Sequence, residues 1–440
     1  MKPNHTGTAG SRTINLITMG CSKNTVDSEH LMRQFEAAGY TLIHNGEAED
    51  ARIVIVNTCG FIQDAKQESI DMILRCVEAK RQGLIDRLYV MGCLSERYAD
   101  TLREEIPEVD RYFGARSLEE VLTGLQVTPD AALWHERTVT TPSHYAYLKI
   151  AEGCNRSCAF CAIPRIRGPY VSRPMEELEQ EARFLADRGV KELLVIAQDL
   201  TGYGMDRYKQ QMLPELVHRL CRIDGIAWIR LHYAYPLKFP TELLQLMQTE
   251  PKLCHYLDIP IQHISTAMLH KMHRHTSREK TEELLRTIRE TVPDIALRTT
   301  LLVGHPGETK ADFDELYRFV GDFRFDRLGV FTYSHEEETF ADKNYSDDVP
   351  DKVKRERAAA IMKLQAGISE ERNQARIGRT YRVIIDRLEG EYYIGRTEYD
   401  SPEVDNEVLI AKQYSLTPGC FYDVRITDAS AYDLTAVQAM

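Results

Sequence analysis

Short apolar runs alternate with amphipathic helical patterns along most of this chain, and this alternation limits the possible folds more than any other feature. In the first 130 residues, the apolar runs are Ile14–Thr18, Ile53–Asn57 and Leu88–Met91. Each has the length of a buried strand and is followed by a helical pattern. These helical patterns are Val26–Ala38, Lys66–Lys80 and Ser95–Glu105. Strands that alternate with helices form an open, mostly parallel sheet, so residues 1–130 predict an N-terminal α/β domain.

A cysteine follows each of these three strands by two or three residues. The three are Cys21, Cys59 and Cys93. In an open α/β sheet the loops after the strands share one edge, where ligands bind, so these distant cysteines should meet in space. Three unrelated buried thiols are the alternative, since free cysteine is often buried. The repeated position favours an iron–sulfur cluster that is held by three thiolates.

The alternation resumes in residues 143–375, after a linker at Leu122–Pro142 that is rich in turn residues. Six strands are expected, at Tyr145–Ile150, Glu192–Ile196, Trp228–Leu231, Tyr256–Ile259, Leu297–Val303 and Arg327–Phe331. Five helices alternate with them, at Met175–Asp187, Leu213–Ile223, Thr241–Thr249, Arg278–Glu290 and Lys310–Val320. Six strands rather than eight predict a partial (β/α)6 barrel with its active site at the carboxyl ends of the strands. A long charged helix, Asp351–Arg376, should lead out of it.

Three cysteines follow the first strand of this barrel within eight residues: Cys154, Cys158 and Cys161, with Phe160 before the last. Their sulfurs can converge on one small object. A structural zinc takes four ligands and an ordinary [4Fe–4S] cluster takes four thiolates. Three thiolates would leave one iron open to a small chelating ligand. A zinc site with a distant fourth ligand is the alternative.

Residues 376–440 predict a small OB-like β-barrel, because short strands alternate with turns. The expected strands are Tyr381–Leu388, Tyr392–Arg396, Val408–Ile410, Phe421–Asp428 and Asp433–Val437. From Arg376 onward there are 7 Lys and Arg against 11 Asp and Glu, whereas a phosphate-binding face needs the opposite sign. Direct RNA binding is therefore not expected. The acidic stretch Asp400–Glu407 suits a basic protein partner, or else is a solvated loop.

The whole chain resembles one family, the radical S-adenosylmethionine (SAM) methylthiotransferases. These join a three-cysteine α/β domain, a radical-SAM barrel and a C-terminal TRAM domain in this order. The matching motifs are Met19–Asn24, Val56–Phe61, Met91–Cys93, Cys154–Cys161 with Ile163–Gly168, and Leu302–Thr309. In the last of them the family more often has Phe where this chain has His305, and a harmless variant is expected there.

Two branches of this family differ in substrate. The MiaB-like branch modifies isopentenyl-adenosine in tRNA, and the RimO-like branch modifies an aspartate of ribosomal protein S-twelve of the small subunit. Segments that resemble the second branch are Ala197–Gly204, Ile259–His263, His232–Pro236 and Ser401–Asp405. The acidic third domain agrees with a basic protein substrate. The tRNA methylthiotransferase remains the alternative, and an iron–sulfur redox sensor or electron carrier is a non-enzymatic one.

The resemblance also implies the cofactors and their residues. Cys154, Cys158 and Cys161 would hold the [4Fe–4S] cluster that cleaves SAM, and Cys21, Cys59 and Cys93 a second [4Fe–4S] cluster that carries the sulfur. Radical chemistry is needed because the C–H bond at the β-carbon of an aspartate is too strong for a side-chain base. By the same resemblance Phe160 would lie against the adenine of SAM. Candidates from their position at the mouth of the barrel are Gln198 and Asp199, for SAM or substrate contact, and Gln262, Arg298 and Glu308. A satisfied polar residue in the barrel layer is the alternative for each. A low-potential electron donor is an expected partner.

The remaining cysteines and a group of histidines are not expected to bind a metal. Cys76, Cys221, Cys254 and Cys420 have no partner at ligand spacing and are expected to pack. His270, His273 and His275, with Met272 and Arg274, predict a solvated turn. The polar N-terminus does not have the pattern of a signal peptide, and no apolar run approaches the roughly 20 residues of a membrane span. We therefore expect a cytoplasmic protein, in which ten cysteines serve as ligands or core residues rather than disulfides.

Overall fold

The computed structural model describes residues 12–439 and divides into two compact units. The first is Met1–Thr140 together with Ile163–Gly168, and the second is Thr141–Ala162 together with Pro169–Met440. The short segment that follows the second cysteine set thus belongs to the unit that carries the first set. None of the helices within residues 12–439 has the length and hydropathy needed to cross a membrane.

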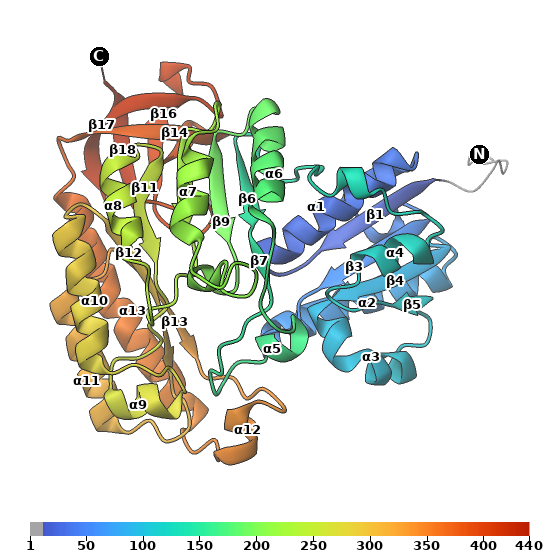
Figure 1. The fold of residues 1–440 in the computed structure, drawn as a ribbon, viewed down its shortest axis with the longest axis horizontal. Helices are drawn as coiled ribbons and strands as arrows, with labels where there is room; N and C mark the ends of the chain where they lie inside the picture. Colours follow the sequence, from blue (N-terminus) through green and yellow to red (C-terminus); the bar gives the residue numbers. More distant parts are fainter. Residues whose placement is uncertain (1–11, 440) are drawn as a thin grey trace. The chain divides into compact units, whose positions relative to one another are not determined.

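The first unit is a five-stranded, wholly parallel sheet in the order β2-β1-β3-β4-β5, which confirms the predicted α/β domain (Figure 1). Its strands are β1 (Thr13–Thr18), β2 (Thr41–His44), β3 (Ile53–Thr58), β4 (Arg87–Gly92) and β5 (Arg111–Tyr112). Its helices are α1 (Ser22–Ala37), α2 (Gln63–Arg81), α3 (Cys93–Glu105), α4 (Leu118–Gly124) and α5 (Ile163–Ile166), with 3₁₀ turns at Ala48–Asp50 and Ala131–Leu133. The sequence did not predict β2 and β5, which are short strands at the two edges.

Alternate residues of the central strands of this sheet fill two separate cores. Val54 and Val56 pack with residues of α2 and α3, whereas Ile55 packs with residues of α1 and α4 on the other face. Successive side chains of a strand point to opposite faces, and a parallel sheet is covered on both. Burial on both faces explains why the central strands are almost continuously apolar. The cysteine-containing loops begin directly after the carboxyl ends of these fixed strands.

The second unit begins with a six-stranded parallel sheet in the order β13-β12-β11-β10-β9-β6, which confirms the partial barrel (Figure 1). The strands are β6 (Tyr145–Lys149), β9 (Glu192–Ile196), β10 (Trp228–Leu231), β11 (Leu253–Asp258), β12 (Ala296–Val303) and β13 (Arg327–Thr332). The helices are α6 (Met175–Asp187), α7 (Leu213–Cys221), α8 (Glu242–Thr249), α9 (Thr266–Lys271), α10 (Arg278–Thr291), α11 (Lys310–Phe323), α12 (Phe340–Asn344) and α13 (Asp351–Gln374). A small hairpin-like pair, β7 (Ala151–Glu152) with β8 (Val171–Ser172), flanks the cysteine loop, and a 3₁₀ turn lies at Leu200–Gly202.

The C-terminal part closes into a five-stranded barrel in the order β14-β15-β16-β18-β17, as predicted. The strands are β14 (Thr380–Glu389), β15 (Tyr392–Thr397), β16 (Glu407–Ala411), β17 (Phe421–Ala429) and β18 (Asp433–Gln438), with a 3₁₀ turn at Lys412–Tyr414. Its pairs are antiparallel except that β16 and β18 run parallel, which closes the barrel. Buried aliphatic residues such as Val383, Ile410 and Ile426 fill its interior.

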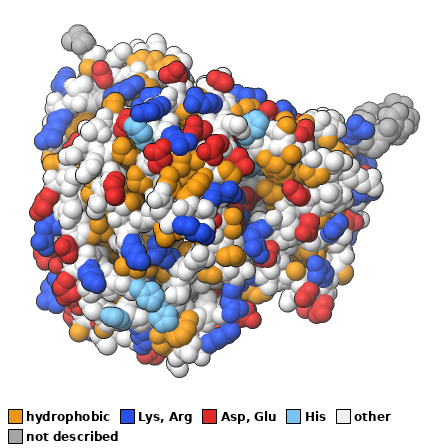
Figure 2. Space-filling model, viewed as in Figure 1, with side chains coloured by type: hydrophobic (Ala, Val, Ile, Leu, Met, Phe, Trp, Pro, Cys, Tyr) orange, Lys and Arg blue, Asp and Glu red, His pale blue; other side chains and the backbone are white. Residues whose placement is uncertain are grey.

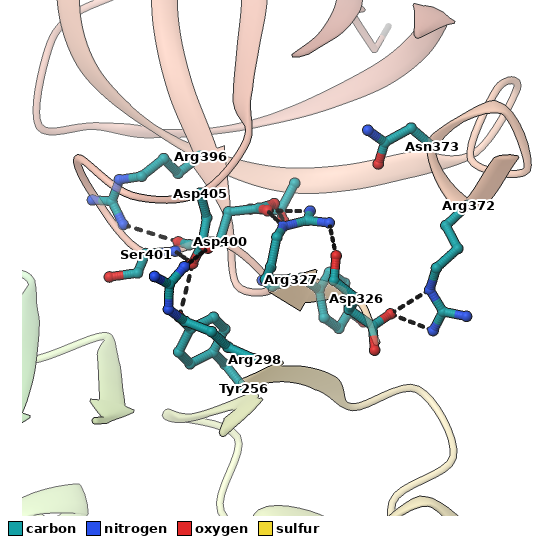
Figure 3. Close-up of polar contacts among 12 residues, drawn as sticks. Tyr256, Arg298, Asp326, Arg327, Arg372, Asn373, Arg396, Asp400, Ser401 and Asp405 are labelled. Atoms are coloured by element: carbon teal, nitrogen blue, oxygen red, sulfur yellow. Dashed lines mark hydrogen bonds and ion pairs between the residues drawn. The ribbon is translucent and has the colours of Figure 1, made fainter. Parts of the chain in front are cut away.

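Buried ion pairs attach this C-terminal barrel to the strands of the partial barrel. Arg327 of β13 holds Asp400 (Nε to Oδ1, 2.9 Å), and Arg298 of β12 holds Asp405 (Nη1 to Oδ1, 2.6 Å), as Figure 3 shows. Asp405 also accepts a hydrogen bond from the hydroxyl of Tyr256 at 2.8 Å. The side chains of both aspartates are 0 % exposed. Such pairs repay their desolvation only when the geometry is well matched, so this attachment is specific.

The acidic loop therefore has a different role from the two interpretations that the sequence suggested. Asp400 and Asp405 are neither solvated nor available to a basic partner, because arginines of the partial barrel neutralise them. Glu403 accepts a hydrogen bond from Tyr145 at 3.2 Å. On the face in Figure 2, Lys and Arg side chains lie among Asp and Glu side chains rather than apart from them. The expectation that these aspartates face a basic partner is therefore wrong for Asp400 and Asp405, whereas Glu403 is exposed.

Candidate functional site

The loop that carries Cys154, Cys158 and Cys161 follows β6 and β7 in the partial barrel. Cys154 is buried, and the other two thiols are half-buried. The loop is held from outside: the N–H of Ala159 donates to the carbonyl of Met272 (3.0 Å), and the N–H of Ala341 donates to the carbonyl of Ala159 (2.8 Å). Segments that follow β11 and β13 thus hold a loop that follows β6, the first strand, which pre-organises the three thiols.

The protein environment of this loop fits an anionic metal cluster. The guanidinium of Arg274 lies 3.3 Å from the sulfur of Cys158 (Nη1 to Sγ), and Arg274 is 4 % exposed. Its Nε is buried without a hydrogen-bond partner. Burial raises the pKa of the Cys154 thiol to about 11, so metal binding must displace a proton there. A cluster with thiolate ligands would supply the negative charge that this buried cation lacks.

The other three cysteines lie at the carboxyl edge of the N-terminal sheet. Cys21 precedes α1, Cys59 follows β3 and Cys93 is the first residue of α3. Burial raises the pKa of the Cys93 thiol to about 11, and the nearby Cys21 and Cys59 add to this rise. A Cβ on Gly20 (φ +87°) would lie 2.8 Å from the sulfur of Cys59, so only glycine leaves room for it. The three thiols therefore share one small space within the first unit.

Arg167 lies beside this second set of cysteines. It donates to Asp27 of α1 (Nη1 to Oδ2, 2.7 Å) and to the Oδ1 of Asn24, and that same oxygen lies 3.8 Å from the sulfur of Cys93. Arg167 also lowers the pKa of the Cys93 thiol, against the larger opposing effect of burial. The sequence motifs contained Asn24 and Arg167, but nothing in the sequence showed that they meet.

Among residues 12–439, no group of three His, Cys, Asp or Glu side chains is arranged to hold a single metal ion. A cluster spreads its thiolate ligands over several irons. The histidine-rich turn after α9 is solvated in part, as predicted, because His270 and His275 are exposed, but Met272 and Arg274 within it are buried. His273 packs on Phe340 with ring centroids 4.2 Å apart.

Four of the predicted cofactor-binding residues lie near the cysteine loop of the barrel. Asp199 accepts from Arg156, which lies between Cys154 and Cys158 (Nε to Oδ2, 2.7 Å). The side-chain amide of Gln198 donates to Glu152 at 3.2 Å, and the amide oxygen Oε1 of Gln198 is buried without a hydrogen-bond partner. Phe160 packs against the core around Met268 and Leu302, and Gln262 forms a bridge with Leu301 and has φ +70°.

The other two predicted residues are occupied by protein partners. Glu308 is paired with Arg357 (3.0 Å) and His263 (3.4 Å), and its side chain is 0 % exposed. Arg298 is held by Asp405 of the C-terminal barrel, as described above. The structure thus assigns both residues to the attachment of neighbouring segments. Their prediction as cofactor-binding residues stays a prediction, and these protein partners are what a ligand would share or replace.

His305, the position where the resembling family more often has Phe, lies in an aromatic surround. Its ring contacts Tyr333, Tyr345 and Phe160, with centroids 5.3, 5.9 and 6.3 Å away. Its Nδ1 donates to the carbonyl of Pro306 (3.1 Å), while its Nε2 is buried without a partner. Burial lowers the pKa of His305 to about 4. The imidazole is therefore neutral at pH 7.

We expect His305→Phe to remove an acid-dependent loss of stability. The folded-state pKa of about 4 lies below the unfolded value of about 6.5, so the unfolded chain takes up a proton first as the pH falls. Protonation of His305 does not change the free energy of unfolding above about pH 6.5. It makes this free energy about 2 kcal/mol lower at pH 5 than at pH 7. Urea unfolding of both proteins at pH 7 and pH 5 measures the difference. Equal pH dependence in the two would contradict a buried neutral histidine.

Family comparisons agree with this arrangement of two cysteine sites and a C-terminal barrel. Residues 13–114 match the uncharacterized protein family UPF0004, residues 148–320 match the radical SAM superfamily, and residues 377–438 match the TRAM domain. Ribosomal protein uS12 methylthiotransferase RimO of Parabacteroides distasonis is 54 % identical over 421 residues, which are 96 % of this chain and 98 % of that protein. The chain belongs to the RimO family. The protein of the same name from Bacteroides thetaiotaomicron is 55 % identical over 96 % of this chain and 97 % of its own length.

Solved structures with low sequence identity resemble much of this chain in fold. The radical SAM methyltransferase TsrM from Kitasatospora setae has a TM-score of 0.54 at 15 % identity, covering 76 % of this chain and 77 % of its own. The cobalamin-dependent radical enzyme OxsB has a TM-score of 0.52 at 13 % identity, covering 80 % of this chain and 56 % of its own. These likenesses concern the fold alone. As a RimO-family member, the chain is a radical-SAM methylthiotransferase that uses a [4Fe–4S] cluster and SAM.

Proposed function

We propose that this enzyme adds a methylthio group to the β-carbon of an aspartate in ribosomal protein uS12. The observation that carries the proposal is the identity of 54–55 % with uS12 methylthiotransferases over 96 % of this chain, which spans both cysteine sets and the C-terminal barrel. The segments Ala197–Gly204 and Ser401–Asp405 agree with that branch. The tRNA methylthiotransferase is the alternative, and no feature of the described residues favours it.

We infer that the cofactor-binding functions of the enzyme are divided among the three domains expected from the sequence. Residues 1–130 would hold the second cluster, residues 143–375 the SAM-cleaving cluster, and residues 376–440 would form the TRAM domain. The three family matches fall within these ranges, which supports the division. A low-potential electron donor would supply the reducing electron. Direct RNA binding is not part of the proposal.

Each set of residues would have a defined task at its cluster. Cys154, Cys158 and Cys161 would hold a [4Fe–4S] cluster, which would supply the electron for reductive cleavage of SAM when bound. Asp199 orients Arg156 within the loop, and Phe160 closes the apolar side of the site. Gln198 offers an unpartnered buried oxygen that could accept a hydrogen bond from SAM or substrate. Cys21, Cys59 and Cys93 would hold a second cluster that supplies the sulfur.

The deciding experiment is mass spectrometry after an anaerobic reaction. The reconstituted enzyme receives SAM, dithionite and an equimolar mixture of ribosomal protein uS12 and tRNA. A methylthio group on an aspartate of the protein is the expected product. The same group on an adenosine, with the protein unmodified, would replace the proposal by the tRNA reaction.

The sulfur-carrier assignment has its own test. Cys21→Ala should retain cleavage of SAM to 5′-deoxyadenosine within about twofold, because the SAM-cleaving cluster keeps its ligands, but should lose methylthio transfer to uS12. Chromatography of 5′-deoxyadenosine and mass spectrometry of uS12 read the two activities from one reaction. Full methylthio transfer by this variant would refute the carrier role of Cys21.

A further inference from the structure

Arg274 reaches the cysteine loop of the barrel from a position 116 residues further along the chain. It lies in the turn after α9, a segment with no metal-binding motif. Its Nη1 is 3.3 Å from the sulfur of Cys158, and its Nη2 donates to the carbonyl of Pro260 at 2.6 Å. A guanidinium is charged at every physiological pH. A permanent buried cation thus contacts one of the three predicted cluster thiolates.

The turn that carries Arg274 is built to hold it there. His273 and His275, on either side, have φ of +56° and +53°, a region that non-glycine residues rarely adopt. Such backbone conformations persist only where the surrounding contacts impose them. These contacts are present: His275 bonds to Ser157 (Nε2 to Oγ, 3.1 Å), and the hydroxyl of Tyr235 donates to the carbonyl of Arg274 at 3.2 Å. These contacts hold the turn against the cysteine loop and orient the guanidinium of Arg274 toward the sulfur of Cys158.

Tyr235 separates two guanidinium groups in this site. The centre of its ring lies 4.1 Å from the guanidinium carbon of Arg274 and 4.1 Å from that of Arg156. Cation–π contacts of this kind stabilise desolvated guanidinium groups. The two arginines differ in their ion pairs, because Asp199 neutralises Arg156 at 2.7 Å. Among the described residues, no carboxylate lies at ion-pair distance from Arg274, so the nearest group that can carry a negative charge beside it is the Cys158 sulfur.

We propose that Arg274 is a positioning residue that hydrogen-bonds the Cys158 thiolate and raises the reduction potential of the SAM-binding cluster. The proposal rests on the cluster assignment to Cys154, Cys158 and Cys161 and is independent of the identity of the substrate. Reduction adds one negative charge to the cluster. A buried cation beside a ligand sulfur stabilises the reduced form more than the oxidised form, since charges interact strongly in a poorly solvated interior. Hydrogen bonds to cluster sulfurs are an established way of tuning such potentials.

The second cysteine set provides an internal contrast within its own unit. Its buried arginine, Arg167, is paired with the carboxylate of Asp27 at 2.7 Å, which offsets its charge. The two sites thus differ in local charge although each has three cysteines. Arg274 gives the SAM-binding site a cation without a carboxylate at ion-pair distance, which favours the reduced state of a cluster bound there.

The test compares Arg274→Met, which keeps a long apolar side chain, with Arg274→Lys, which keeps the charge. Both are made in full-length protein in which Cys21, Cys59 and Cys93 are alanine, so that one cluster remains. After anaerobic reconstitution, the reduction potential is measured by redox titration followed by electron paramagnetic resonance, without SAM and with SAM. Arg278→Met is the matched control, because Arg278 is four residues away and is held on the surface by Glu282 and Glu315.

Without SAM, Arg274→Met should lower the potential so that the ratio of reduced to oxidised cluster at a fixed potential falls at least tenfold, which is about 59 mV for one electron. The reduction potential of Arg274→Lys should fall less, and that of Arg278→Met should equal the potential of the parent protein. An unchanged potential in Arg274→Met with full iron content would overturn the proposal, as would a shift that occurs only with SAM. If Arg274→Met loses its iron, Arg274→Lys decides: a lowered potential supports the proposal and an unchanged one refutes it. A parent protein without any cluster signal would instead refute the cluster assignment itself.

Discussion

Cys158→Ala should abolish reductive cleavage of SAM, with 5′-deoxyadenosine formation falling more than about 100-fold. Loss of residues that only orient metal ligands costs about 10- to 100-fold, and loss of a ligand itself should exceed this range. Cys158 is also the sulfur that Arg274 contacts at 3.3 Å, so its removal leaves a buried cation unpaired. Anaerobic assay with dithionite, together with iron analysis, measures both consequences.

Cys420→Ala is the matched control for this experiment. Cys420 is an exposed thiol of the C-terminal barrel, and it lies in neither cysteine set. We expect this variant to keep the iron content and the rate of the parent enzyme. If Cys158→Ala retained both as well, the three-thiolate assignment in the barrel would be wrong.

Asp400→Asn should destabilise the second unit by about 3–5 kcal/mol, the range for breaking a buried ion pair by removing one partner. Asp400 is fully buried and accepts from Arg327 at 2.9 Å, as Figure 3 shows. It also accepts from the hydroxyl of Thr397 at 2.6 Å. Arg327 is itself buried, so the asparagine variant leaves its charge without a carboxylate. Urea unfolding followed by far-ultraviolet circular dichroism measures the change in free energy.

The matched control is Glu407→Gln, which breaks another arginine–carboxylate pair of the same barrel. Its partner Arg387 lies at 2.8 Å, but the two side chains are 46 % and 34 % exposed. An exposed pair contributes about 1 kcal/mol or less, because water screens it. Similar losses in the two variants would show that burial of Asp400 does not decide its contribution. A double variant, Arg327→Met with Asp400→Asn, should recover part of the loss, since it removes the unpaired charge.

The order of elements and the positions of the six cysteines could be predicted from the sequence. Strand periodicity, helix periodicity and the place of a cysteine after a strand are local properties, and a parallel sheet brings the carboxyl ends of its strands to one edge. The short edge strands β2 and β5 escaped prediction. With four and two residues, they are too short to show a period, and their pairing with β1 and β4 depends on the rest of the sheet.

The surroundings of the cysteines could not be predicted in the same way. Arg298 looked like a residue of the active-site mouth, but it binds Asp405 of the C-terminal barrel. The acidic loop looked like a surface for a partner, but its aspartates are buried against arginines. In both cases the partner that neutralises the charged residue lies about 70 to 110 positions away, so the residue's own segment does not reveal it.

The sequence by itself therefore determined that this chain holds two sets of three thiols on an α/β framework with a small C-terminal barrel. Cysteine spacing within a loop and position after a strand are fixed by local geometry. Only the tertiary structure decided which charges face those thiols: Arg274 meets Cys158 across 116 positions, and Arg167 meets Asp27 across 140. The reason is physical, because the energy of a buried charge depends on partners that packing brings from distant segments, and no local pattern records them.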